Sequence, residues 1–220
     1  MVFTSCLTTD RARDTLGTPP PMPRFDAIFF DFDGVLIDSE PVHWACWREV
    51  LLPLGVSLEW EFYRDRCIGV DDREMLKWMA GDRDWRELWS QYPAKKALFR
   101  ERMMASPPFP ETLATTLERL RTDSYRMAVV SSSSREEIEP ILERAGLRGY
   151  FETVVGGGDV QRHKPDPEPY LLAASRLGTK SAVVLEDSEA GMTSGRAAGF
   201  EVLQVRHPSD VPHVLRAAGI

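Results

Sequence analysis

The stretch at residues 27–35, which reads AIFFDFDGV, decides the fold prediction. Its apolar run at 27–30 has no polar alternation, which is typical of a strand covered on both faces of a parallel sheet. Asp31 and Asp33 follow where this strand ends, and residues two apart on an extended chain point the same way. The two carboxylates can therefore face one crevice, and Gly34 lets the chain turn away sharply. Such a pair repels unless a cation or a shared proton lies between the acids. The alternative is an ordinary acidic turn.

Three later segments contain polar residues that fit a shared site with Asp31 and Asp33. Each places polar residues after an apolar run or in a loop between two such runs: Ser131 and Ser132 after 127–130, Lys164 within HKPDP, and Glu186 and Asp187 after 182–185. In open α/β sheets, ligands bind beyond the carboxyl ends of the strands, where the strand order reverses. We therefore expect these side chains to meet Asp31 and Asp33 at one edge of the sheet.

Each of these segments also has an ordinary structural interpretation. The serine run can simply cap a helix, because Ser133 and Ser134 each precede a glutamate by three residues, as in a capping box. Lys164 can be a solvated loop lysine. The pair at 186–187 can be an exposed turn. The order and spacing of all the segments together argue against a joint accident.

The residue types indicate phosphate chemistry. Carboxylate oxygens suit a hard cation, magnesium above all, and the chain has no Cys/His cluster with zinc spacing. One carboxylate can attack phosphorus, and a second carboxyl group can protonate the leaving oxygen and then deprotonate water. A lysine and the metal offset the negative charge, while a serine hydroxyl and backbone N–H groups hold phosphate oxygens. These arguments leave open which of Asp31 and Asp33 has which role.

Two other enzyme classes are disfavoured. The chain contains no GxxxxGK[ST] loop of the kind that nucleotide kinases use. No GxSxG elbow surrounds Ser131, which argues against a serine hydrolase.

The four motifs together resemble those of the haloacid dehalogenase superfamily, in its phosphoryl-transfer branch. They are DFDGVLIDSE at 31–40, VVSS at 129–132, KPDP at 164–167 and LEDS at 185–188. The chain looks most similar to the group that holds beta-phosphoglucomutase, phosphoglycolate phosphatase and sugar-phosphate phosphatases. The resemblance spans about residues 25–206. Together the motifs are highly specific, although any one of them is not.

The resemblance implies a role for each motif residue. The nucleophile is Asp31, and the general acid/base is Asp33. The phosphoryl group is held by Ser131, Ser132 and Lys164. Magnesium is held by Asp31, the Asp33 backbone carbonyl and Asp187, with Glu186 contributing directly or through water. An acid at position 33 also argues against true dehalogenation, because halide leaves without needing a proton.

Composition and patterning predict an α/β protein with two parts. All six tryptophans fall between residues 44 and 89, in a helix-like stretch, and 106–110 is rich in proline. We therefore predict a doubly wound, Rossmann-like parallel sheet core at 25–40 and 106–220, with an inserted all-α module at 41–105 whose core the tryptophans build. The resemblance implies that this insert is a cap domain. Residues 1–24 are expected to form a flexible tail, and Met22 offers an alternative translation start.

The core is expected to alternate strands and helices after the cap. The predicted strands are 127–130, 153–155, 182–186 and 201–205, and the predicted helices are 111–121, 135–146, 168–177 and 189–198. The family topology would place the first strand beside the fourth, so that Asp31 lies opposite Asp187.

Charge and cysteine content set the expected partners and compartment. The formal net charge of −7 gives no sign of a nucleic-acid surface, and no apolar run approaches the ~18 residues of a membrane span. Three cysteines make an odd count without framework spacing, which favours reduced thiols and a cytoplasmic protein. We expect a monomer, or else a dimer, whose partner is a small phosphorylated metabolite.

The predicted cap should choose the substrate. His43 aligns with a cap-hinge histidine of the mutase branch, and Arg73 lies in the segment that aligns with the mutase specificity loop. A packed histidine and a surface arginine are the alternatives. The lysine that the mutase pattern has before Gly69 is replaced by Cys67 and Ile68. A mutase must hold two phosphates, so we predict a magnesium-dependent phosphatase for a sugar phosphate or phosphoglycolate, with an aspartyl-phosphate intermediate. A beta-phosphoglucomutase-like phosphomutase is the alternative.

Overall fold

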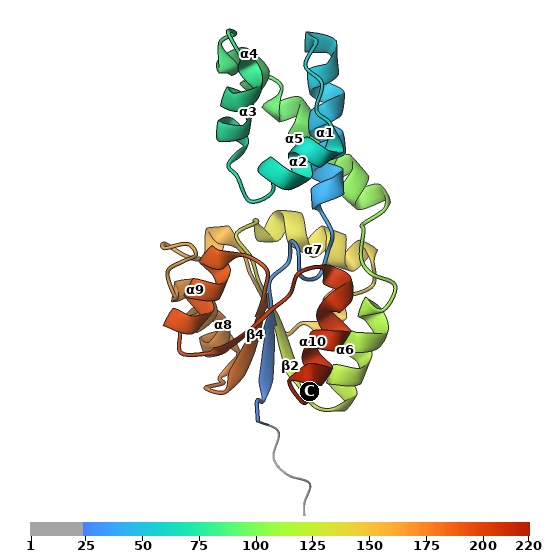
Figure 1. Ribbon diagram of the computed structural model, residues 1–220. Helices are drawn as coiled ribbons and strands as arrows, with labels where there is room; N and C mark the ends of the chain where they lie inside the picture. Colours follow the sequence, from blue (N-terminus) through green and yellow to red (C-terminus); the bar gives the residue numbers. More distant parts are fainter. Residues whose placement is uncertain (1–23) are drawn as a thin grey trace, which may run out of the picture.

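A computed structural model describes residues 24–220 of the chain. It has a core of strands and helices, drawn in the lower part of Figure 1, and a separate helical unit above it. The predicted flexible tail at 1–24 lies, apart from Arg24, outside the described residues.

The core contains one sheet of five parallel strands. The strands are β1 (Ala27–Phe30), β2 (Arg126–Val130), β3 (Thr153–Val155), β4 (Ala182–Glu186) and β5 (Glu201–Gln204), in the order β3-β2-β1-β4-β5. The predicted α/β fold class is confirmed, and so is the prediction that β1 lies beside β4. Because the chain builds outward from β1 first on one side and then on the other, the strand order reverses between β1 and β4. A ligand site is expected at this point.

Helices cover both faces of the sheet (Figure 1). They are α6 (Leu113–Thr122), α7 (Arg135–Arg144), α8 (Glu168–Leu177), α9 (Glu189–Ala197) and α10 (Val211–Ala217). On β1, Ile28 and Phe30 pack with residues of α6, α7 and α10, whereas Phe29 packs on the opposite face with residues of α8. Every residue of β1 is buried, as its unbroken apolar run predicts. Helix α10 was not predicted from the sequence.

The helical unit lies between β1 and α6 in the sequence. Its helices are α1 (Glu40–Leu51), α2 (Trp60–Arg66), α3 (Asp72–Ala80), α4 (Trp85–Trp89) and α5 (Tyr92–Ala105). Trp47 is fully buried in a hydrophobic cluster of the helical unit, and this cluster is separate from the core beside the sheet. Four more tryptophans pack against this cluster, whereas Trp78 is 53% exposed. The tryptophan-core prediction is therefore confirmed for five of six residues, and the exact domain boundaries stay predictions.

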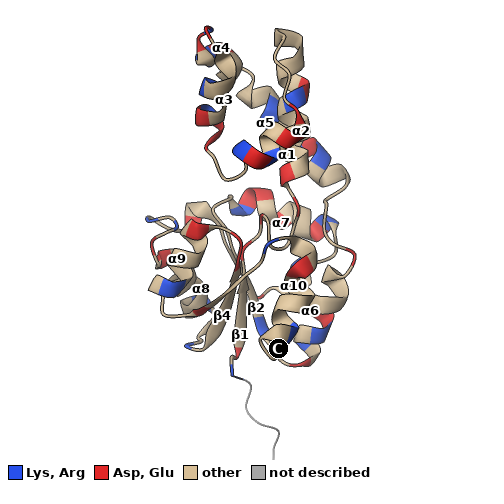
Figure 2. Ribbon diagram, in the orientation of Figure 1, with Lys and Arg blue, Asp and Glu red and all other residues tan. Residues whose placement is uncertain are grey.

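Two linkers connect the helical unit to the core, and they run together. The backbone N–H of Asp38 donates to the carbonyl of Pro108 at 3.1 Å, which joins the outgoing segment to the proline-rich return segment. Charged residues of both signs are spread over both parts in the view of Figure 2. Within residues 24–220, no helix combines the length and apolarity needed to cross a membrane.

We expect two leucine substitutions to separate buried from exposed positions on the core helices. Leu117 on α6 is fully buried, whereas Leu171 on α8 is 48% exposed. Leu117→Ala should lower the free energy of unfolding by about 2–5 kcal/mol, because it removes buried methyl groups and leaves a cavity. Leu171→Ala should change it by less than about 0.5 kcal/mol. Urea unfolding of both variants measures this, and equal losses would contradict the arrangement of α6 on the sheet.

Candidate active site

Three neighbouring strands deliver the predicted site residues to one edge of the sheet. Phe30 of β1 is in register with Leu185 of β4 on one side and with Val129 of β2 on the other. The backbone N–H of Asp31 continues this ladder by donating to the Leu185 carbonyl at 3.0 Å. Asp31 therefore lies between the ends of β2 and β4, where Ser131 and Glu186 emerge.

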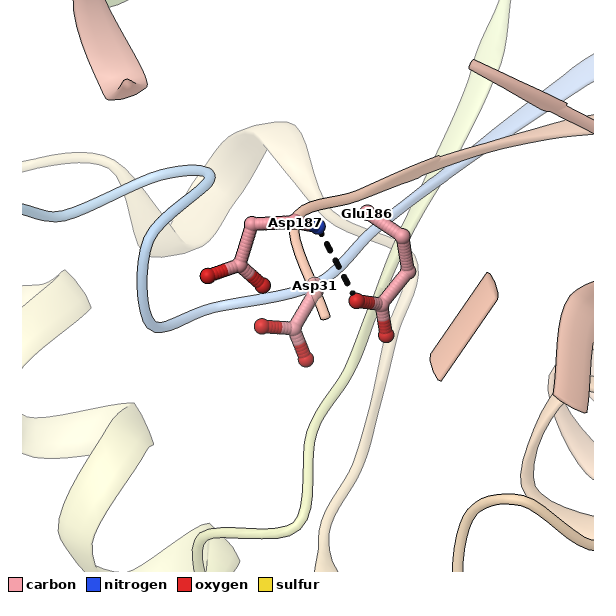
Figure 3. Close-up of side chains that lie close together, drawn as sticks. All are labelled: Asp31, Glu186 and Asp187. Carbon is pink, nitrogen blue, oxygen red and sulfur yellow. Dashed lines mark hydrogen bonds between the residues drawn. The ribbon is translucent and has the colours of Figure 1, made fainter. Parts of the chain in front are cut away.

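The side chains of Asp31, Glu186 and Asp187 come together at this edge (Figure 3). Each offers a carboxylate oxygen, and the three oxygens lie within 4.8 Å of one another. Two glycines make room for them. A Cβ on Gly34 would overlap the Asp187 carboxylate, and one on Gly191 would overlap that of Glu186. Gly34 also has a φ of +74°, in the left-handed region that favours glycine.

Lys164 reaches into this group of acids. Its Nζ donates to Asp31 Oδ1 at 2.6 Å, to Glu186 Oε1 at 2.5 Å and to the carbonyl of Val130 at 2.9 Å. The side chain is only 5% exposed, so the interpretation as a solvated loop lysine is wrong. Burial lowers the pKa of Lys164, but the charges of Asp31 and Glu186 outweigh it and raise that pKa overall.

Glu186 is the most heavily hydrogen-bonded of the acids, and it is fully buried, so the exposed-turn interpretation is wrong for it. Oε1 accepts from Lys164 and from the Tyr170 hydroxyl at 2.9 Å. Oε2 accepts from the backbone N–H groups of Asp187 and Ser188 and from the Ser188 hydroxyl. With five donors already on its two oxygens, Glu186 fits an indirect contact to a cation, through water, better than a direct one.

Asp33 is not hydrogen-bonded to this ion-paired group and has two serine hydroxyls as its partners. Its Oδ1 accepts from the Ser39 hydroxyl at 2.7 Å and its Oδ2 from the Ser133 hydroxyl at 3.0 Å. Burial raises the pKa of Asp33, although both serine hydrogen bonds oppose the shift. A raised pKa suits a carboxyl group that gives and takes a proton.

The serine run does more than cap a helix. Ser131 is buried, and its hydroxyl accepts from the backbone N–H of Ser133 at 3.0 Å. Ser134 is the N-cap of α7, but its side chain makes no capping hydrogen bond. The capping-box interpretation is therefore wrong, because Ser133 is not the N-cap residue and Ser134 accepts no backbone N–H; the Ser133 hydroxyl donates to Asp33. Ser132 is exposed at the same edge.

Of the two predicted substrate residues in the helical unit, only His43 borders the site. A cavity of about 680 Å³ between α5 and α7 is lined by Asp33, His43 and Lys95, among others. His43 Nδ1 lies 2.9 Å from Lys95 Nζ, and its ring stacks on Phe99. Burial, together with the Lys95 charge, lowers the pKa of His43 to about 3. Arg73 is not in the cavity wall; its guanidinium lies over the Trp89 ring at 4.8 Å.

Sequence reasoning missed four residues that contact the site. They are Ser39, Ser133, Tyr170 and Lys95. Ser39 and Ser133 stand inside motifs already singled out, and Tyr170 follows Lys164 by six residues at the start of α8, so position alone could have flagged them. Lys95 carried no signal. It is one of two adjacent lysines on α5, yet it is only 4% exposed and also lies 3.3 Å from Asp72 Oδ2.

The acid cluster fits a hard divalent cation. All of its donors are carboxylate oxygens, the kind that such cations prefer. Burial raises the pKa of Asp31 well above its usual value, and burial together with the Glu186 charge raises the pKa of Asp187 to about 6. A cation between these groups would offset both effects. Asp31 and Asp187 are the residues placed to hold it directly.

A family profile described as haloacid dehalogenase-like hydrolase matches residues 28–205. The chain belongs to this family. The match covers every residue of the site described above. The chain is therefore a hydrolase, which is the enzyme class that the motif resemblance implies.

Two curated relatives and one solved structure illustrate the similarity. The chain is 32% identical to the phosphorylated carbohydrates phosphatase of Thermotoga maritima, over 80% of this chain and 82% of the relative. It is 32% identical to the fructose-1-phosphate phosphatase YqaB of Escherichia coli, over 83% and 97%. A Thermotoga maritima structure assigned as a beta-phosphoglucomutase superposes with a TM-score of 0.70 at 27% identity, over 87% of this chain and 99% of that one.

We expect Gly191→Ala to weaken divalent metal binding. Alanine would normally favour a helix such as α9 by up to about 1 kcal/mol, but here its Cβ would displace the Glu186 carboxylate and, with it, Lys164 and the Asp187 backbone. Calorimetric titration with Mg²⁺ should give at least about a tenfold rise in Kd, that is, about 1.4 kcal/mol. Gly158→Ala is the matched control, since nothing lies within 4 Å of its Cβ position. Equal Kd values for the two variants would contradict the role given to Gly191.

We also expect His43 to make the protein less stable as the pH falls. Its pKa is about 3 when folded and 6.5 in the reference state, so the unfolded chain binds the proton first. The free energy of unfolding should therefore decrease between pH 7 and pH 5, before most carboxylates titrate. Urea unfolding at both pH values should show a smaller decrease in His43→Gln. The exposed His213 on α10 supplies the control, and a His213→Gln variant that lost the pH dependence instead would refute the assignment.

Proposed function

We propose that this chain is a magnesium-dependent phosphatase that hydrolyses a small phosphomonoester, of the sugar phosphate or phosphoglycolate type, through an aspartyl-phosphate intermediate. The enzyme class is that of the phosphoric monoester hydrolases, and both curated relatives named above are phosphatases. One observation carries the finer proposal. Asp31 is ion-paired to a buried lysine, and Asp33, with a raised pKa, stands two residues away on the same turn.

The first half of the reaction forms a bond between Asp31 and phosphorus. An Asp31 oxygen attacks the phosphoryl group as the bond from phosphorus to the substrate oxygen breaks. Asp33 gives its proton to that leaving oxygen, so that the alcohol departs uncharged. Lys164, 2.6 Å from Asp31, offsets the repulsion between the carboxylate and the phosphate.

The second half releases phosphate. Asp33, now ionised, takes a proton from water, and the water oxygen attacks phosphorus as the bond to Asp31 breaks. Ser131, Ser132 and the backbone N–H groups at the start of α7 are suited to hold the phosphoryl oxygens. Magnesium, held by Asp31, Asp187 and the Asp33 carbonyl with Glu186 behind them, would stabilise the negative charge of the transferred group.

The helical unit is proposed to act as a cap that closes over the site and excludes water. His43 and Lys95 would face the substrate from this side. We propose a cytoplasmic protein, consistent with the free thiols of Cys46 and Cys67. A monomer remains the expected assembly, with a dimer as the alternative.

The phosphomutase alternative is favoured by the structural similarity to the protein assigned as a beta-phosphoglucomutase, and by the three cations of α5 in the cavity wall, Lys95, Lys96 and Arg100. A mutase has to hold a second phosphate with cations of its cap. Here Arg73 stacks on Trp89 outside the cavity wall. Cys67, which stands with Ile68 where the mutase pattern has a lysine, is buried in the core of the helical unit. These contacts support the phosphatase.

We expect phosphate release from a panel of phosphomonoesters to require both magnesium and Asp31. The panel contains fructose 1-phosphate, glucose 6-phosphate, phosphoglycolate and beta-glucose 1-phosphate. Asp31→Asn keeps the shape of the side chain but removes its charge, so kcat should fall by at least about a thousandfold. Asp123→Asn, at the exposed end of α6, is the matched control.

The outcome also separates the two candidate functions. Formation of glucose 6-phosphate from beta-glucose 1-phosphate with a bisphosphate activator, and without free phosphate, would establish the mutase. Release of phosphate by Asp31→Asn at the wild-type rate would refute the proposed nucleophile. Thermal unfolding of the variant verifies that it is folded.

A further inference from the structure

The leaving group of the proposed reaction has a defined place in the structure. If Asp33 protonates the leaving oxygen, the rest of that group must lie on the Asp33 side of the phosphorus. The cavity of about 680 Å³ between α5 and α7 has Asp33, Ser133 and His43 in its wall. In Figure 1, α7 lies across the top of the core beneath the helical unit. The chemistry of this cavity therefore describes the leaving group, on the condition that the proposed function holds.

The charged side chains around the cavity provide no excess of positive charge. Its wall contains three cations and four acids: Lys95, Lys96, Arg100, Asp33, Asp72, Glu136 and Glu137. Lys96 Nζ, from α5, lies 3.0 Å from Glu137 Oε1 on α7, and Lys95 is held by Asp72. His43 adds no charge near neutral pH, because its pKa is about 3. A second phosphate or a carboxylate on the leaving group would find no excess of positive charge here.

The wall is polar in one part and apolar in another. On α7, the polar residues of the wall are Glu136 and Glu137, beside Ile138, and the lining one turn later is apolar, with Pro140 and Ile141. Phe99, Met103 and Met104 line the cavity from α5. A ligand that reached from Asp33 along α7 would pass from hydroxyl-binding groups to apolar side chains, which gain from burying apolar surface.

The cavity has room for a sugar together with an apolar extension of it. Its volume lies within the range of roughly 300–1,000 Å³ that is usual for small-molecule pockets. At about 30 Å³ for each water molecule, it has room for the equivalent of about twenty waters. A hexose fills only part of this space, and glycolate fills much less.

We infer that the substrate is a phosphomonoester whose leaving group is uncharged, bears hydroxyl groups near the phosphate and ends in an apolar portion, such as a phosphorylated sugar linked to an aryl or alkyl group. Phosphoglycolate and sugar bisphosphates are then poor substrates. The apolar portion lies between Met104 of α5 and Pro140 of α7, beyond the Lys96–Glu137 ion pair.

Two matched substrate pairs test the inference by steady-state kinetics with Mg²⁺. The first pair is phenyl glucoside 6-phosphate and glucose 6-phosphate, which differ only in the apolar group. We expect kcat/KM to be at least about tenfold higher for the phenyl glucoside, since one buried methylene is already worth roughly fourfold. The second pair is fructose 1-phosphate and fructose 1,6-bisphosphate, where we expect the bisphosphate to be at least about tenfold worse.

A variant then locates the effect. Met104→Gln keeps the length of the side chain but makes it polar, and it should reduce the phenyl-to-glucose ratio of kcat/KM by about fivefold. Met79→Gln, a half-buried methionine of α3 outside the cavity wall, should leave the ratio at its wild-type value. The readout is a ratio between substrates, so a general effect on closure or folding cancels.

The results distinguish failure of the inference from failure of the proposed function. Equal kcat/KM within the first pair, or an unchanged ratio in Met104→Gln, would overturn the inference while phosphate release from both sugars upheld the phosphatase. Phosphate release from phosphoglycolate alone would overturn the inference and uphold the phosphatase. Absence of phosphate release from these four compounds and from phosphoglycolate would overturn the proposed function and the inference with it.

Discussion

The structure depends on one buried cation. Lys164 places its ammonium group among the Asp31 carboxylate, the Glu186 carboxylate and the Val130 carbonyl, and thus joins the ends of β1, β2 and β4. Burying a charge is costly unless it is paired and hydrogen-bonded, and removing one partner of a buried pair costs about 3–5 kcal/mol. Any displacement of one strand end would leave either the lysine or an acid unpaired. The ion pairs therefore fix the relative positions of the three strand ends on which the site is built.

This constraint explains why small residues stand where they do. The carboxylates of Glu186 and Asp187 can approach Asp31 only because positions 34 and 191 carry no Cβ. Tyr170 adds a second restraint from α8, since its hydroxyl donates to Glu186 and its ring lies 5.1 Å from Lys164 Nζ. Its own ring is stacked on Phe29 of β1. The sheet, α8 and the ionic group thus hold one another in place.

Much of this arrangement could be predicted from the sequence, because it is written in local patterns. A buried strand followed by Asp-x-Asp-Gly, and two further strands ending in Ser and in Glu-Asp, determine both the sheet and the edge at which the side chains meet. The capping boxes were wrong because Ser134, the N-cap of α7, accepts no backbone N–H, while the Ser133 hydroxyl donates to Asp33, which is distant in sequence. Lys95 was missed for a similar reason. Its burial depends on His43, Asp72 and the ring of Trp47, which only the packing of α1, α3 and α5 brings together.

Asp33 stands where the two halves of the molecule meet. One of its oxygens accepts from Ser39, the residue directly before α1, and the other accepts from Ser133, ahead of α7. Asp33 is therefore bonded both to the linker that carries the helical unit and to the loop that leads into α7. A movement of the helical unit would reach Asp33 through this linker, which is also paired with the return segment by the bond from Asp38 to Pro108. Loss of the Ser39 bond would raise the pKa of Asp33 further, since that hydrogen bond is what most strongly opposes the effect of burial. The position of the helical unit and the readiness of Asp33 to hold a proton are in this way physically coupled.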